Sequence, residues 1–269
     1  MREASTSSAD PHWVVRAASA TDGGVSHHFN EDSVCIGPGG GHAVIADGMG
    51  GEPAGLRASE WVSGTLSALI ESADREEPAD PMPMRPAQRP SDWICRCADG
   101  LRADGAVCRS PDARHQVAAL WLHEGRAVVA HVGDSRVYRL RSGILSRLTR
   151  DHSLLEDGPL VPVGLVRRRP VVEPSSALLT QVLGIDERVI PAVRDESLRA
   201  GDLYLLCTDG LTGFVGDLEL ATLLSNTGRA VNLLAEDLVR AALDARATDN
   251  VTVAVIRLEP ADASVGGHR

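Results

Sequence analysis

The chain of 269 residues contains no lysine, so every fixed positive charge is an arginine. This absence excludes nucleotide binding through a Walker-type phosphate loop and catalysis through a Schiff base, because both need a lysine. Aromatic residues make up only 3% of the chain, which argues against nucleic-acid binding by base stacking. The formal net charge of −10 further argues against a nucleic-acid or anionic-membrane partner.

Cysteines are few and irregularly spaced, and long apolar runs are missing. The five cysteines are Cys35, Cys95, Cys97, Cys108 and Cys207. An odd number at irregular spacing favours neither a disulfide framework nor a zinc site, and it fits a reducing compartment. No apolar run is long enough to span a membrane, and none follows residues 1–8 as in a signal peptide. A cytoplasmic protein is therefore expected.

The rest of the chain is rich enough in apolar residues, at 43%, to form one large domain. We expect that domain over residues 12–258, between polar tails at 1–11 and 259–269. Strands in hairpins and helices in pairs predict antiparallel sheets with helices packed outside. The predicted strands are 13–18, 117–122, 126–132, 136–140, 144–148, 203–207 and 251–258. The predicted helices are 52–70, 91–108 with Ser91 as N-cap, 217–224 and 229–245.

Four apolar segments each end or begin at an aspartate. Asp47, Asp134 and Asp209 end three of them, and Asp249 opens the fourth. Carboxylates gathered at one rim repel each other unless cations lie between them. Any one of these aspartates could simply make a turn. Together with Asn30-Glu31-Asp32, the set favours a cluster of hard divalent cations bound by oxygen ligands.

Six short segments follow one another in an order that is more specific than any one of them. They are Asn30-Glu31-Asp32, residues 47–51 (Asp-Gly-Met-Gly-Gly), 132–138 (Val-Gly-Asp-Ser-Arg-Val-Tyr), 148–153 (Leu-Thr-Arg-Asp-His-Ser), 201–211 and 249–252 (Asp-Asn-Val-Thr). As an ordered set they resemble the metal-dependent serine/threonine protein phosphatases of type 2C, the PPM family, in their bacterial form. The resemblance covers about residues 13–258. It implies an α+β fold, a four-layer α-β-β-α sandwich with two central antiparallel sheets flanked by helices.

The resemblance also implies a binuclear Mn²⁺ or Mg²⁺ centre, for which all-oxygen ligands are suited. It assigns metal-binding roles to Asp32, Asp47, Gly48, Asp134, Asp209 and Asp249. Asp47 would bridge the two metals, and Gly48 would offer its backbone carbonyl. Asp209 and Asp249 would bind one metal, and Asp32 would lie in the second shell of the other.

The same resemblance implies a reaction. Two close cations lower the pKa of a bridging water, so that hydroxide can attack phosphorus in line. The expected substrates are proteins carrying phosphoserine or phosphothreonine, with a Ser/Thr kinase as a further candidate partner. Asp47, Asp209 and Asp249 are the expected catalytic residues, and Asp134 would help hold a third, weaker metal.

The chain departs from the family pattern at several positions. His27 stands where the family places a phosphate-binding Arg, either as a replacement phosphate donor or as a tolerated surface substitution. Residues 114–116 (Arg-His-Gln) replace the family's Gly-Thr-Thr strand opening. These departures leave open an alternative, a pseudophosphatase that binds a phosphoprotein or kinase without turnover. Cys108 and Arg114 match the spacing of a cysteine phosphatase, but Pro and Asp inside that loop suit a phosphate cradle badly.

Overall fold

The computed structural model describes residues 4–6, 13–26, 29–49, 53–75, 88–103, 114–157, 179–186 and 188–261 of the chain. Within these ranges the strands form two sheets, and every pair of neighbouring strands is antiparallel. The first sheet has the order β1 (Ala4–Thr6), β2 (Trp13–Asp22), β11 (Val251–Pro260), β10 (Leu203–Cys207), β7 (Arg136–Arg141), β8 (Ile144–Arg147). The second has the order β3 (Ser33–Ile36), β4 (His42–Met49), β5 (Arg114–His123), β6 (Arg126–Val132), β9 (Ala192–Ser197).

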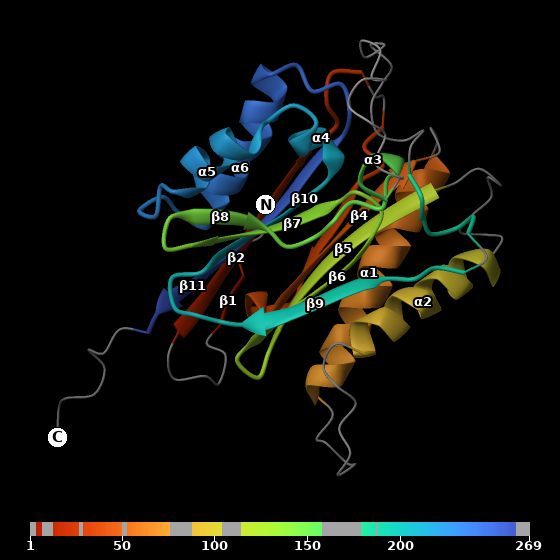
Figure 1. Ribbon diagram of the computed structural model, residues 1–269, viewed down its shortest axis with the longest axis horizontal. Helices are drawn as coiled ribbons and strands as arrows, with labels where there is room; N and C mark the ends of the chain where they lie inside the picture. Colours follow the sequence, from red (N-terminus) through yellow and green to blue (C-terminus); the bar gives the residue numbers. More distant parts are fainter. Residues whose placement is uncertain are drawn as a thin grey trace.

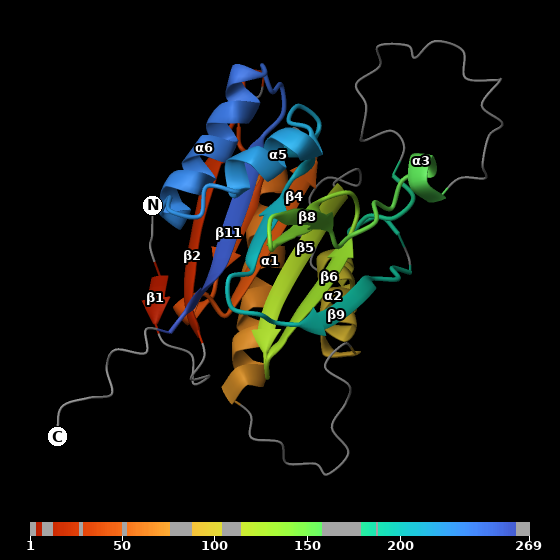
Figure 2. The same ribbon diagram turned by 60° about the vertical axis from the view of Figure 1, so that its left-hand side comes forward.

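Pairs of helices cover the outer faces of the two sheets (Figure 1). Helices α5 (Asp217–Leu224) and α6 (Val231–Asp244) lie on the first sheet, and α1 (Pro53–Arg75) and α2 (Gln88–Ala103) lie on the second. Figure 2 shows the two pairs on opposite sides of the paired sheets. Shorter helical segments are the 3-10 helix Pro38–Gly40, α3 (Leu154–Asp157) and α4 (Asp209–Thr212). The predicted four-layer α-β-β-α sandwich is confirmed.

Apolar side chains fill the space between each pair of layers. On β4, Val44 and Ala46 pack towards α1, whereas Ala43 and Ile45 pack between the two sheets. Successive side chains of a strand point to opposite faces, and here both faces are covered. This explains why the central strands read as continuous apolar runs instead of alternating apolar and polar residues.

Two predicted hairpins are confirmed by their turns. Glu124 and Gly125 have φ values of 46° and 72° between β5 and β6. Ser142 and Gly143 have φ values of 50° and 77° between β7 and β8. Positive φ at both central residues is the geometry of a type I′ turn, whose twist matches that of the strands it joins.

The helices differ from the prediction mainly at their ends. The second helix begins at Gln88, so Ser91 lies inside it and the predicted N-cap is wrong. The reason is that Pro90 falls in the first turn, where a helix does not use the missing N–H. The first helix begins with Pro53 and continues to Arg75, beyond the predicted end at residue 70. None of the helices in the described ranges has the length and apolar character needed to cross a membrane.

Three strands at the sheet edges, β1, β3 and β9, were not predicted from the sequence. β3 and β9 flank the second sheet, and β9 carries polar residues at 194–197. The three-residue strand β1 lies within residues 1–11, for which a polar tail is predicted. At the other end, β11 runs to Pro260, just beyond the predicted domain end. The domain bounds themselves stay predictions.

Candidate metal centre

Asp47 and Gly48 lie near the end of β4, which continues to Met49. Asp47 is buried, with 8% of its surface exposed. A Cβ at Gly48 would lie 2.8 Å from the carbonyl oxygen of Glu31 and 2.9 Å from that of Gly55. Glycine is therefore needed here because two backbone segments approach the strand closely.

Asp32 precedes β3 and is held by threonines from the first sheet. The hydroxyl of Thr208 donates a hydrogen bond to Oδ2 of Asp32 at 3.0 Å, and the side chain of Thr252 forms another hydrogen bond with it. The pKa of Asp32 is raised to about 7, chiefly by burial and in addition by the charges of Asp209 and Asp249. The two threonine hydrogen bonds oppose this rise but do not cancel it.

Asp209 and Asp249 reach the rim from adjacent strands. Asp209 follows β10 as the first residue of α4, and Asp249 precedes β11. Because β10 and β11 are antiparallel neighbours, the end of one meets the start of the other. The contact is close, since a Cβ at Gly210 would lie 1.9 Å from the carbonyl oxygen of Asn250.

Asn250 joins the loop before β3 to this rim, a role that nothing in the local sequence indicates beyond its place beside Asp249. Its Oδ1 accepts a hydrogen bond from the backbone N–H of Glu31 at 2.8 Å. Its Nδ2 donates to the carbonyl oxygens of Gly23 at 2.9 Å and Phe29 at 3.2 Å. One amide side chain thus fixes the segment that carries Asp32 against the start of β11.

Asp134 comes directly after β6 and the turn residue Gly133, which has a φ of 100°. Its backbone N–H donates to Oε1 of Gln116 at 2.8 Å. Oδ1 of its carboxylate is buried and accepts no hydrogen bond from the described residues. The pKa of Asp134 is raised to about 8, chiefly by burial and in addition by the charges of Asp209 and Asp151.

The predicted carboxylates form one electrostatic group. Burial raises the pKa of Asp47 well above its usual range, and the charges of four other aspartates raise it further: Asp32, Asp209, Asp249 and Asp134. In the described parts of the chain, no three Asp, Glu, His or Cys side chains are close enough to chelate one ion by themselves. A divalent cation with water ligands suits such a set, since Mg²⁺ commonly binds through one or two carboxylates and keeps several waters.

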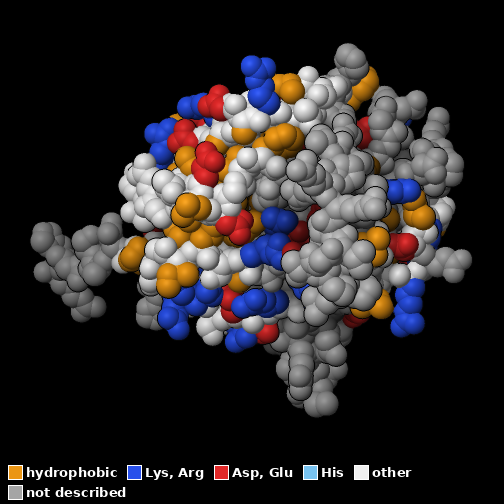
Figure 3. Space-filling view, turned by 45° about the horizontal axis from the view of Figure 1, so that its top comes forward, with side chains coloured by type: hydrophobic (Ala, Val, Ile, Leu, Met, Phe, Trp, Pro, Cys, Tyr) orange, Lys and Arg blue, Asp and Glu red, His pale blue; other side chains and the backbone are white. Residues whose placement is uncertain are grey.

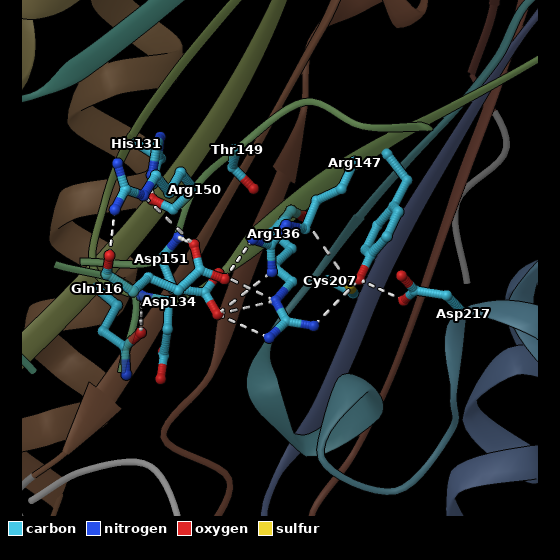
Figure 4. A network of polar contacts seen from close by, with 12 residues as sticks. Gln116, His131, Asp134, Arg136, Arg147, Thr149, Arg150, Asp151, Cys207 and Asp217 are labelled. Atoms are coloured by element: carbon cyan, nitrogen blue, oxygen red, sulfur yellow. Dashed lines mark hydrogen bonds and ion pairs between the residues drawn. The ribbon is translucent and has the colours of Figure 1, made fainter. Parts of the chain in front are cut away.

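An ion pair next to Asp134 holds the loop that follows β8 (Figure 4). Arg136 on β7 binds Asp151 through two contacts, Nε to Oδ1 at 3.0 Å and Nη2 to Oδ2 at 2.7 Å. Arg136 also donates from Nη1 to the hydroxyl of Tyr138 at 3.2 Å, and that hydroxyl donates to Asp217 at 3.0 Å. The network thus connects the loop at Asp151 to β7 through Arg136 and, through Tyr138 and Asp217, to α5.

His131 and His152 are hydrogen-bonded to backbone groups. Their rings stack with centroids 4.8 Å apart, and Nε2 of His131 lies 2.8 Å from the carbonyl oxygen of Arg150. Nδ1 of His152 accepts a hydrogen bond from the N–H of Gly133 at 3.3 Å, and the N–H of His152 donates to the carbonyl oxygen of Gly133 at 3.0 Å. The pair therefore connects the turn before Asp134 to the 148–153 segment.

Some predicted residues lie outside the described parts of the chain. These are His27 and Cys108. Cys207 is fully buried in the apolar layer between the first sheet and its helices.

Comparison with known proteins gives close relatives of one kind, although no protein-family model matches the chain. The serine/threonine protein phosphatase PstP of Mycobacterium tuberculosis is 32% identical over 254 residues, which cover 90% of this chain and 45% of PstP. The chain thus spans about half the length of that relative. The serine/threonine phosphatase Stp of Listeria monocytogenes is 29% identical over 252 residues, which cover 90% of this chain and 95% of Stp.

Solved structures agree with these sequence matches. The crystal structure of Mycobacterium tuberculosis PstP matches with a TM-score of 0.73 and 30% identity, over 91% of this chain and 99% of that one. A crystal structure of the PstP catalytic domain in complex with two manganese ions matches with a TM-score of 0.74 and 29% identity, over 92% of this chain and 99% of that one.

Proposed function

Because the chain belongs to the type 2C, or PPM, family of serine/threonine protein phosphatases, we propose that it hydrolyses phosphoserine and phosphothreonine on proteins with bound divalent cations. The observation that carries this proposal is the convergence of five aspartates at one rim of the sandwich, of which Asp32, Asp47 and Asp134 are buried. Burial and the charges of neighbouring aspartates disfavour the ionised forms of Asp32, Asp47 and Asp134, and a divalent cation among them would oppose both effects.

The proposed ligands are the residues that the rim brings together. Asp47 would bridge two cations, with the carbonyl oxygen of Gly48 beside it, and Asp209 and Asp249 would bind one of them. Asp32 would act from the second shell of the other cation. The donor set consists of oxygen atoms, which favours Mn²⁺ or Mg²⁺. The two manganese ions of the related PstP structure make Mn²⁺ the first cation to test.

A third, weaker cation would be held in part by Asp134. Its buried Oδ1, which accepts no hydrogen bond from the described residues, supports this assignment, because a buried acceptor without a partner is costly. Bound divalent cations would supply an acidified water near neutral pH and would stabilise the charge on the phosphoryl group. The protein's own part is to hold the carboxylates ionised and in place.

His27 is proposed as a substrate-binding residue on the loop before Asn30. Both flanks of that loop are held close to the rim, which supports the proposal. The N–H of Val25 donates to the carbonyl oxygen of Ala247 at 3.1 Å, and Asn250 donates to the carbonyl oxygen of Phe29. An imidazolium would attract a phosphate dianion, whereas a neutral ring would offer one hydrogen bond.

The partners proposed are phosphorylated proteins, with a Ser/Thr kinase among them, in the cytoplasm. Free cysteines support a reducing compartment; those in the described ranges are Cys35, Cys95, Cys97 and Cys207. Figure 3 shows Arg side chains lying among Asp and Glu side chains on one face of the molecule. Such mixed charge supports the expectation that neither nucleic acid nor an anionic membrane is the partner.

The direct test is phosphate release from a phosphothreonine peptide and from p-nitrophenyl phosphate, with Mn²⁺ and with EDTA. We expect turnover with Mn²⁺ and its loss in EDTA. Peptide binding without turnover at any Mn²⁺ concentration would contradict the proposal and would instead support a phosphoprotein-binding pseudophosphatase.

A further inference from the structure

Gln116 lies between two of the proposed ligands in the second sheet. It is on β5 and pairs directly with Asp47 of β4 across the ladder. Side chains of directly paired residues point to the same side of a sheet, so Gln116 emerges beside Asp47. Only 1% of its surface is exposed.

From this position the Gln116 side chain reaches the turn that carries Asp134 (Figure 4). Its Oε1 accepts the N–H of Asp134 at 2.8 Å, and its Nε2 lies 3.8 Å from the sulfur of Met49. It also packs on the Gly133 backbone, where an added Cβ would lie 2.7 Å from Cβ and 2.8 Å from Oε1 of Gln116. The side chain of Gln116 therefore holds the turn at Gly133 and Asp134, while the backbone of Gln116 is paired with Asp47.

We propose that Gln116 is a positioning residue that sets the Asp134 carboxylate relative to Asp47 for the weakest of the bound cations. This inference rests on the proposed function. Gln116 touches neither substrate nor the reacting atoms; it acts through the backbone of Asp134. Side chains that orient ligands in this way typically change metal affinity or activity by about 10- to 100-fold when they are replaced.

A purely structural role makes a different prediction. The buried N–H of Asp134 needs an acceptor, and losing it would lower the free energy of unfolding whether or not a cation binds. Positioning predicts in addition that the effect of Gln116 depends on the Asp134 carboxylate. The two roles can be separated by measuring cation binding and by a double-mutant cycle.

The variant Gln116→Met keeps the length of the side chain and removes its carbonyl acceptor. Gln181→Met is a matched control, because Oε1 of Gln181 accepts the backbone N–H of Ile190 at 2.9 Å, on a different segment. Gln116→Met, Asp134→Ala and the double variant are compared in the full chain. Mn²⁺ binding is followed by titration calorimetry, and turnover is followed as kcat and KM against Mn²⁺ concentration.

We expect Gln116→Met to weaken the lowest-affinity Mn²⁺ by about 10-fold and to leave the tighter ions within about 2-fold. The kcat should fall at low Mn²⁺ and recover in part at high Mn²⁺, while KM for p-nitrophenyl phosphate stays unchanged. In the Asp134→Ala background, Gln116→Met should have no further effect on Mn²⁺ binding. If Gln116→Met does not fold, Gln116→Asn replaces it, because the shorter side chain withdraws the acceptor, and the same results are expected.

Three results would overturn the inference: unchanged binding of the lowest-affinity Mn²⁺ in the Gln116 variants, additive effects in the cycle, or an equal loss in Gln181→Met. Failure of the proposed function would look different. In that case the wild-type protein would itself lack Mn²⁺-dependent turnover, whereas failure of this inference alone leaves wild-type turnover intact.

Discussion

The hydroxyl of Thr208 donates a hydrogen bond to the carboxylate of Asp32 across 176 positions of sequence. The same oxygen accepts the N–H of Thr252 at 3.0 Å. Thr208 therefore joins the loop before β3 to the paired ends of β10 and β11. Asp209 directly follows Thr208, and Asp249 lies three positions before Thr252, so loss of this contact should affect both carboxylates of the rim.

Thr208→Val keeps the shape of the side chain and removes both hydrogen bonds. We expect the free energy of unfolding to fall by about 1–3 kcal/mol, because the buried N–H of Thr252 loses its acceptor. Thr222→Val is the control, since Thr222 is exposed on α5 and donates only to its own helix. It should change stability by less than about 0.5 kcal/mol. Urea unfolding of both variants measures the difference, and equal losses would contradict a special role for Thr208.

Without cations, the buried aspartates of the rim should make the free energy of unfolding depend on pH. The pKa of Asp32 is about 7 and that of Asp134 about 8 in the folded chain, against about 3.9 when unfolded. Between these pKa values the folded state binds more protons than the unfolded state. The contribution of the two aspartates to the free energy of unfolding is therefore fully present below about pH 4 and is lost as the pH rises through about 8.

Thermal unfolding in EDTA between about pH 5 and 8.5 tests this pH dependence. We expect the midpoint to fall as pH rises and Mn²⁺ to restore it most at the alkaline end. Asp32→Asn should reduce the slope, whereas Asp195→Asn, at an exposed ion pair on β9, should retain it. A thermal unfolding midpoint in EDTA that rises with pH would show that folding does not raise the pKa values of these carboxylates.

Arg136→Lys tests the ion pair beside Asp134. Lysine keeps the positive charge but lacks the planar fork that contacts both oxygens of Asp151. We expect a loss of about 1.5–3 kcal/mol in the free energy of unfolding, because hydrogen bonds to a buried charged group are lost. In Arg126→Lys, at the exposed pair with Asp195, the loss should be less than about 1 kcal/mol. Similar losses in the two variants would show that Asp151 gains nothing from the two-pronged contact.

The sequence predicted those parts of the fold that are buried on both faces or closed by tight turns. The strands β10 and β11 read clearly because neighbouring layers cover both of their faces. β3 and β9 were not predicted, because edge strands carry partly exposed residues that give no continuous apolar run. The predicted N-cap at Ser91 is wrong because Pro90 occupies the first turn of the helix, which begins at Gln88.

At the site, the sequence indicated which residue types gather but not what holds them. The aspartates could be found because each lies where an apolar run ends or begins. The roles of Thr208, Asn250 and Gln116 could not, because each contacts a segment that is distant in sequence. Asn250, for example, meets Glu31 over 219 positions. Such contacts follow from strand order and register, which local patterns do not determine.

Phosphate release should depend on divalent cations bound at the rim of aspartates. The most direct measurement is the rate of phosphate release from a phosphothreonine peptide in Mn²⁺ by wild type, Asp47→Asn and Asp209→Asn, with Asp195→Asn as control. We expect the two rim variants to lose at least about 100-fold in kcat and the control to match wild type. Full turnover of wild type in EDTA, or wild-type rates in both rim variants, would contradict the account.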